Sequence, residues 1–223
     1  MFKLHLGELC WNTTAALKKC DALFARFADV RSSLVVDSEV HDLCLQIIGH
    51  ADHVRKILFS DGPRGKNEEP KRAQMRQTRS RFLQCLLKGV DVTHLKQAAV
   101  RNAMAHFDER IDQLIIKLNK KRLPKDRQAD IVYYNLSIET DELLKSLAPW
   151  SIVNPEYIRA YFYGPKVYVH FGHKFDLGAL YDELYAVNKT LRDQMPGSMF
   201  EDGGLFLVLP DASYEANGVT IAV

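Results

Sequence analysis

Three polar residues near the middle of the chain have side chains that could together cleave a phosphodiester, in the segment Arg101-Asn102-x-x-x-His106. The imidazole of His106 can give or take a proton near neutral pH. The guanidinium of Arg101 stays charged and can hold two phosphate oxygens, and Asn102 can orient either partner or a sugar hydroxyl. This set predicts RNA cleavage without a metal ion, because the histidine can move the proton and the arginine can stabilise the phosphate. The expected product ends in a 2′,3′-cyclic phosphate.

The surrounding residues, THLKQAAVRNAMAHFDERIDQLIIKLN, predict one amphipathic helix over 93–119 with Thr93 as its N-cap. Asn102 and His106 are four residues apart, so they lie on one face of such a helix. Arg101 and His106 are five residues apart, about 140° round the axis. They converge if the guanidinium arm wraps round the helix, or if two copies of the helix meet in a two-fold symmetric dimer.

This pattern, placed after several expected helices, resembles the R-x4–6-H motif of the HEPN superfamily, in which a polar residue commonly follows the arginine. The residues RNAMAHFDERID also resemble that helix of HEPN-like proteins, and the resemblance extends over roughly 10–195. It implies a metal-independent endoribonuclease that acts on RNA, needs no cofactor, and forms its site at a homodimer interface from Arg101, Asn102 and His106. It also implies a role in defence or toxin–antitoxin biology, with an antitoxin or defence-system protein as partner.

Two observations limit what this resemblance implies. Asp108 stands where HEPN toxins silenced by a nucleotidyltransferase partner carry a tyrosine, so that mode of control is not expected. An arginine and a histidine on one helix also often form a solvated or structural pair. The alternative is therefore a non-catalytic HEPN-like dimeric module that binds nucleic acid or a partner protein.

The net charge of +2 conceals a strong asymmetry along the chain. Residues 1–59 are neutral, residues 60–127 carry a net charge of +9, and residues 128–223 carry −7. A positive surface near the motif is what a phosphodiester polymer requires, although such charges can also be solvated helix faces. The residues expected to contact nucleic acid are Lys71, Arg72, Arg76 and Arg79. A second basic cluster spans 117–127.

Composition indicates a globular protein, with 47% hydrophobic and 26% charged residues. No apolar run is long enough for a membrane span, and the N-terminus lacks the core of a signal peptide, so a cytoplasmic location is expected. The four cysteines have no C-x-x-C spacing, which favours buried, reduced thiols. His50 and His53 could ligate a metal, but no third ligand is spaced to complete a site, so none is expected.

The periodicities predict a mainly α fold: an antiparallel HEPN-like helical bundle with an inserted C-terminal β-hairpin or small sheet and a final helix. The expected bundle covers 1–198 with its β insertion at about 130–172, and 199–223 form a tail with strand-like runs at 205–209 and 219–223. Helices are expected at 12–30, 38–59, 71–88, 93–119, 141–147 and 176–194, and strands at 131–139, 157–163 and 166–171.

The two strands expected around Gly164-Pro165 carry several aromatic side chains at alternating positions. Bases of RNA could stack on such a surface, and the same side chains could equally cover a hydrophobic core. Both interpretations concern Tyr161, Tyr163, Tyr168 and His170.

Overall fold

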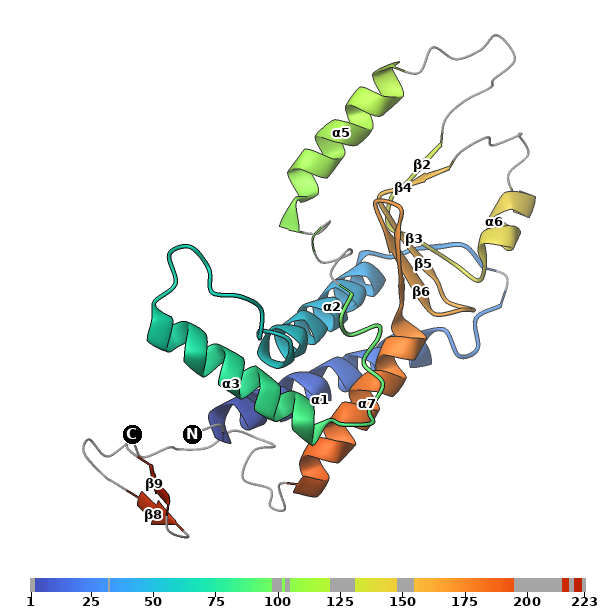
Figure 1. The fold of residues 1–223 in the computed structure, drawn as a ribbon. Helices are drawn as coiled ribbons and strands as arrows, with labels where there is room; N and C mark the ends of the chain where they lie inside the picture. The colour runs from blue at the N-terminus through green and yellow to red at the C-terminus, as the bar shows by residue number, and fades with distance from the viewer. Residues whose placement is uncertain are drawn as a thin grey trace.

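The computed structural model describes residues 3–31, 33–97, 102, 105–120, 131–147, 155–194, 214–216 and 219–221. This part of the chain is mostly helical, with six helices beside a small mixed sheet (Figure 1). The predicted mainly α composition and the predicted small sheet are therefore confirmed. Among the described residues, no helix has the length and apolar character needed to cross a membrane.

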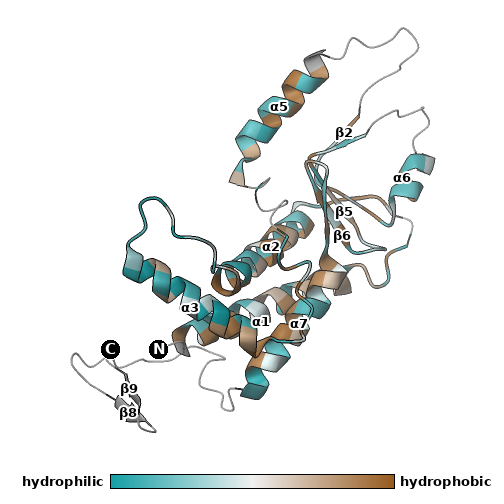
Figure 2. Ribbon diagram, viewed as in Figure 1, coloured by the Kyte–Doolittle hydropathy of each residue, from teal (hydrophilic) through white to brown (hydrophobic). Residues whose placement is uncertain are grey.

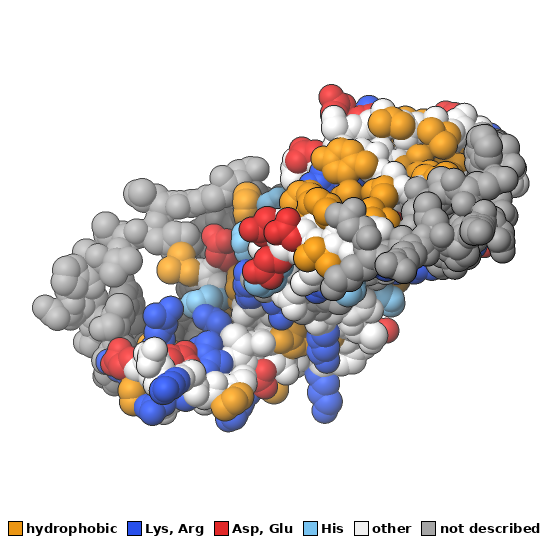
Figure 3. Space-filling view, turned by 90° about the horizontal axis from the view of Figure 1, so that it is seen from above, with side chains coloured by type: hydrophobic (Ala, Val, Ile, Leu, Met, Phe, Trp, Pro, Cys, Tyr) orange, Lys and Arg blue, Asp and Glu red, His pale blue; other side chains and the backbone are white. Residues whose placement is uncertain are grey.

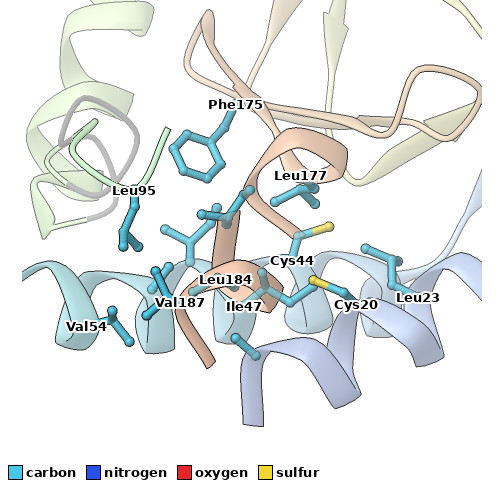
Figure 4. Packing of buried hydrophobic residues seen from close by; sticks show 14 of the residues in the cluster. Cys20, Leu23, Cys44, Ile47, Val54, Leu95, Phe175, Leu177, Leu184 and Val187 are labelled. Carbon is cyan, nitrogen blue, oxygen red and sulfur yellow. The ribbon is translucent and has the colours of Figure 1, made fainter. Parts of the chain in front are cut away.

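Three helices form the main core: α1 (Lys3–Arg26), α2 (Ser38–Leu58) and α7 (Leu177–Gln194). Their apolar faces meet in a cluster that also receives Leu95 and Phe175 (Figure 4). Each fully buried leucine in such a core contributes about 1.5–3 kcal/mol relative to an exposed one. Asp176 caps the last helix, because its Oδ1 accepts the Ala179 backbone N–H at 2.8 Å.

The first helix begins at Lys3, whereas the sequence predicted a start at 12. Asn12 and Thr13 lie inside this helix and bond to earlier carbonyls of it: Asn12 Nδ2 donates to the Glu8 backbone oxygen and Thr13 Oγ1 donates to the Leu9 backbone oxygen, both at 2.8 Å. Polar side chains that could cap a helix are therefore satisfied inside it.

A third helix, α3 (Pro70–Leu86), packs beside α2 and is largely hydrophilic along its length (Figure 2). Pro70 opens it, as expected of a residue without a backbone N–H at the first helical position. Gly89 follows its end with a positive φ of 92°, a conformation that glycine adopts without strain. The predicted helix at 71–88 is therefore confirmed, with each end shifted by one or two residues.

The sheet has the strand order β1-β3-β5-β6-β7, in which β3 and β5 run parallel and the other pairs antiparallel. The predicted hairpin is confirmed as β5 and β6, in register from Arg159↔His170 to Phe162↔Val167, with residues 163–166 in the turn. The strands are β1 (Val35–Val36), β3 (Leu136–Ile138), β5 (Arg159–Phe162), β6 (Val167–His170) and β7 (His173–Asp176).

The two faces of this sheet have different partners. Tyr161, Tyr168 and Phe175 belong to the helical core on one side. On the other side Ile138 and Phe162 join a second, smaller cluster. That cluster includes Leu144 of α6 (Asp141–Leu147), a helix whose bounds match the prediction. The central strands β3, β5 and β6 are therefore buried on both faces.

The predicted strand at 131–139 is divided into two. Asn135 has a φ of 54° and breaks the extended backbone. The residues before it form β2 (Val132–Tyr133), which pairs in parallel with β4 (Glu156–Tyr157), and those after it form β3. Near the end of the chain β8 (Tyr214–Ala216) pairs with β9 (Val219–Ile221), whereas the strand-like run at 205–209 lies outside the described residues.

The prediction of one continuous helix over 93–119 is wrong. Residues 93–96 form a turn, and α5 (Phe107–Lys120) begins one residue after His106. Thr93 is not an N-cap; its backbone N–H is instead bound at 3.1 Å by Oδ1 of Asp91. The next two backbone N–H groups are taken by Glu183 of α7, a contact from a distant part of the chain that local periodicity does not encode.

Candidate active site

Of the three residues predicted to carry catalysis, Asn102 and His106 are placed by the structure, and Arg101 lies outside the described residues. Asn102 is helical and exposed, and His106 occupies the turn that leads into α5. Helical hydrogen bonds run through this turn, from the His106 N–H to the Asn102 oxygen at 3.2 Å and from the Arg110 N–H to the His106 oxygen at 3.0 Å. Asn102 and His106 are therefore one helical turn apart, as their spacing predicted.

The side chain of His106 is 58% exposed, and it lies beside the carboxylate of Glu109. Nδ1 of His106 lies 3.4 Å from Oε2 of Glu109, a long contact between two exposed groups that contributes little to stability. The contact involves Nδ1, and Nε2 has no ion-pair partner among the described residues. His106 can therefore present a base to solvent.

The surface next to His106 is acidic. Asp108 and Glu109 occupy the first turn of α5, and Asp112 follows one turn later. Figure 3 shows acidic side chains gathered over α5, whereas most Lys and Arg side chains in that view gather over α3 and the loop before it. Among the described residues the main positive surface therefore lies away from His106, whose neighbours on α5 include the acidic Asp108 and Glu109 as well as the basic Arg110.

Two of the four residues predicted to contact nucleic acid stabilise a loop. Arg76 forms an ion pair with Glu68 at 2.9 Å, and it donates to the Gly62 and Pro63 carbonyls at 3.2 Å. The Arg76 guanidinium thereby lowers the pKa of Glu68 to about 2. Arg79 donates to the Ser60 hydroxyl at 2.7 Å.

The other two predicted contacts, Lys71 and Arg72, are exposed on the first turn of α3 and could meet a phosphate. In the second predicted basic cluster, residues 121–127 lie outside the described part of the chain.

The aromatic residues of the hairpin do not form a stacking surface. Tyr161, Tyr168 and His170 are at most 1% exposed, and Tyr163, the most exposed of the four, reaches 7%. The interpretation that they cover a core is confirmed, and the base-stacking interpretation is wrong. Side chains alternate between the two faces of a strand, and these side chains lie on the face of the hairpin that packs against α1 and α2.

Phe107 anchors the start of α5 on the sheet. Its ring lies 6.0 Å from that of His170 and 5.4 Å from that of Phe171. The Arg159 guanidinium stacks over the same ring at 4.8 Å and over Tyr134 at 5.4 Å. Phe107, which follows the motif histidine, is therefore packed against the sheet.

The far end of α5 has a shallow pocket and an apolar surface. The pocket, about 140 Å³ in volume, lies between α5 and β4, where Lys117 pairs with Glu156. Ile115 and Ile116 are half exposed on α5, and Val132 and Tyr134 are exposed on or next to β2. Figure 3 shows hydrophobic side chains gathered in this region.

The histidines of α2 are not arranged as a metal site. His50 and His53 both direct Nδ1 at the Oδ1 atom of Asn12, at 3.0 and 3.4 Å. Among the described residues there is no group of three or more His, Cys, Asp or Glu that could hold a metal ion.

Sequence reasoning missed a set of buried polar residues beneath Phe107. Burial lowers the pKa of His41 to about 4, and it lowers that of His170 to about 4 as well. Arg159 is close enough to contribute to both shifts. The signal available in the sequence was a histidine inside an apolar stripe: His41 lies between Val40 and Cys44, which are both buried.

None of the protein-family models, curated proteins or solved structures compared with this chain matches it.

Proposed function

We propose that this protein is a metal-independent endoribonuclease of the HEPN-like type, in which Arg101, Asn102 and His106 act at an interface between two copies of the chain. The observation that supports it best is the placement of His106. It is exposed, it lies one helical turn after Asn102, and its Nε2, which has no ion-pair partner among the described residues, can act as a base.

In the proposed reaction, Nε2 of His106 accepts the proton of a 2′-hydroxyl while the 2′-oxygen attacks the adjacent phosphorus. The bond from phosphorus to the 5′-oxygen breaks, and the leaving oxygen takes a proton from a protonated His106 of the second copy. Arg101 stabilises the additional negative charge on the phosphate, and Asn102 positions the ribose. The products are a 2′,3′-cyclic phosphate and a 5′-hydroxyl.

A second copy has a surface on which to dock. The exposed apolar side chains Ile115 and Ile116 lie on the helix that His106 leads into, and covering them would remove apolar area from water. In this proposal α1, α2, α3 and α7 correspond to the antiparallel bundle of a HEPN-like fold. The motif resemblance further suggests a defence or toxin–antitoxin role with an antitoxin or defence-system partner. The proposed location is the cytoplasm, where the four free thiols stay reduced.

The test compares the wild-type protein with His106→Ala on a mixed RNA pool in the presence of EDTA. Loss of a general acid–base group lowers the rate by about 10²–10⁴-fold, so cleavage should nearly vanish in the variant. His53→Ala removes another exposed histidine, on α2, and should leave the rate unchanged. New 5′-hydroxyl ends should accept a kinase label without prior phosphatase treatment. Equal cleavage by wild type and His106→Ala would contradict the assignment.

The acidic surroundings of His106 favour the alternative, a non-catalytic HEPN-like dimeric module that binds nucleic acid or a partner. Asp108, Glu109 and Asp112 create a field that disfavours a phosphate chain and favours a basic partner surface. If the wild type and His106→Ala are equally inert on diverse RNAs while the mass in solution is that of a dimer, this alternative is the better account.

A further inference from the structure

A group of polar side chains is buried between α2 and the sheet, beneath the ring of Phe107. It comprises His41 of α2, Arg159 of β5, and Tyr168 and His170 of β6, and we call it the buried polar cluster. Three of these side chains are at most 1% exposed. The rings follow one another, with centroids of His41 and Tyr168 6.0 Å apart and those of Tyr168 and His170 6.1 Å apart.

The hydrogen-bonding groups of the cluster are unsatisfied within the described part of the chain. Both ring nitrogens of His41 and of His170, the Tyr168 hydroxyl and Nε of Arg159 are buried with no hydrogen-bond partner there. The Asn135 backbone approaches His41 closely enough to favour its protonated form, but no hydrogen bond of normal geometry results. Buried polar groups of this kind are rare, because each one costs about 1–3 kcal/mol when it has no partner.

The charge of the cluster is also unbalanced. Arg159 remains a cation, yet among the described residues no carboxylate forms an ion pair with it. It donates to the Tyr134 hydroxyl and to Oδ1 of Asn135, both at a long 3.4 Å, and it stacks on Phe107. All of these partners are neutral. A half-buried cation whose partners are all neutral still lacks a counter-charge, and an anion placed beside it would supply one.

The unsatisfied groups define what would complete the cluster. Arg159 Nε–H, one N–H on each neutral imidazole and the Tyr168 O–H are all donors. Ordered water could accept these hydrogen bonds, but it would leave the positive charge uncompensated. An oxyanion accepts several hydrogen bonds at once and also supplies the missing charge.

We propose that the buried polar cluster binds an oxyanion, a phosphate or carboxylate group, through Arg159, His41, Tyr168 and His170. Arg159 is half-buried and is the member that reaches the surface, beside the exposed ring of Tyr134. The group therefore enters past Tyr134 and Phe107. This proposal does not depend on RNA cleavage, since it concerns different residues and a ligand that need not be a polymer.

The experiment measures thermal unfolding of the full chain at pH 7 while chloride is replaced by inorganic phosphate at constant ionic strength. A saturable rise in Tm is expected for the wild type, because a ligand that binds the folded state stabilises it. Arg159→Gln should abolish the rise. Arg81→Gln removes an exposed arginine of α3 that has no assigned role in binding, and it should leave the rise unchanged. A parallel titration with acetate separates a phosphate site from a carboxylate site.

Tyr168→Phe provides a second variant in case Arg159→Gln fails to fold. It removes only a hydroxyl that has no partner in the described part of the chain, so the variant should fold. Its half-saturating phosphate concentration should rise several-fold. In NMR spectra of the wild type, phosphate should shift the imidazole signals of His41 and His170. The proposal is overturned if neither anion gives a saturable effect, or if Tyr168→Phe responds as the wild type does; ordered water then fills the cluster.

Discussion

Glu183 of α7 accepts the backbone N–H of Leu95 at 2.8 Å, although the two residues are 88 positions apart in the sequence. Its other carboxylate oxygen accepts the backbone N–H of His94 at 2.8 Å and lies 3.0 Å from the His94 ring nitrogen Nδ1. The carboxylate is only 6% exposed. One buried side chain of the last long helix therefore holds the turn that leads into the motif segment.

Replacing Glu183 by glutamine should destabilise the protein by about 2–3 kcal/mol, because hydrogen bonds to a charged acceptor are lost and an amide N–H₂ is placed against backbone donors. Urea unfolding followed by circular dichroism measures the change. Glu142→Gln in α6 alters an exposed carboxylate and should leave the midpoint within about 0.5 kcal/mol of the wild type. Equal effects from the two substitutions would show that the contact at Leu95 contributes nothing.

Stability should fall as the pH is lowered from about 6.5 to about 4. The pKa values of His41 and His170 are lowered to about 4 by burial, whereas the unfolded chain keeps the ordinary value of 6.5. In that window the unfolded state binds more protons, so each histidine removes up to about 1.4 kcal/mol per pH unit. Urea unfolding in chloride buffers at pH 7, 6 and 5 measures the slope.

The groups that face these two histidines support this direction. Arg159 and His173 lower the pKa of His170 further, whereas the Asn135 backbone and, to a smaller extent, Asp37 oppose the lowering of the His41 pKa by burial. His170→Asn should reduce the slope by about half, since one of the two titrating groups is removed. His53→Asn, on the exposed face of α2, should keep the wild-type slope. An unchanged slope in His170→Asn would contradict the assignment.

The elements that local patterns determine were predictable from the sequence. The helix α6 and the hairpin of β5 and β6 follow their apolar periodicity, and Asp176 caps α7 as a residue of that type does. The turn at 93–96, which replaces the start of the expected helix, was not predictable, because it is held by Glu183, which lies far away in the sequence. The sequence offered one signal of this contact: Glu183 is a carboxylate within the apolar stripe of α7, three residues after Leu180.

The candidate site was predictable only in part, for the same reason. The four-residue spacing of Asn102 and His106 survives in the structure because it depends on one helical turn. The electrostatic surroundings do not follow from charge counted along the chain, since Arg76 is directed into its own loop. The buried polar cluster joins α2 to β5 and β6, and no local pattern brings His41 next to Tyr168.

Arg76 and Arg72 should behave differently when each is replaced by glutamine. Arg76→Gln removes the ion pair with Glu68 and the hydrogen bonds to the Gly62 and Pro63 carbonyls, so the loop at 60–69 should become more sensitive to protease. Arg72→Gln should leave the loop protected and affect only the binding of polyanions. Limited proteolysis with mass spectrometry distinguishes them. If both variants are cut at the same rate, Arg76 does not hold the loop.

A single cysteine should react with a thiol reagent in the folded protein. Burial raises the pKa of Cys10, raises that of Cys20 to about 12, and raises that of Cys44 well above its usual range. Cys85 faces solvent on α3, which corrects the expectation that all four thiols are buried. Ellman's reagent should therefore titrate one thiol in buffer and four in guanidinium chloride. Rapid reaction of two or more thiols in buffer would contradict this placement.

The packing of α7 on α1 has a consequence for synthesis on the ribosome. Asn188 of α7 donates to the Thr13 hydroxyl at 2.7 Å, and these residues are 175 positions apart. Because translation proceeds from the N-terminus, Leu23 and its apolar neighbours on α1 emerge long before the helix that covers them. The nascent chain must carry an open hydrophobic face through most of its elongation, which makes it a natural client for chaperones that shield such surfaces.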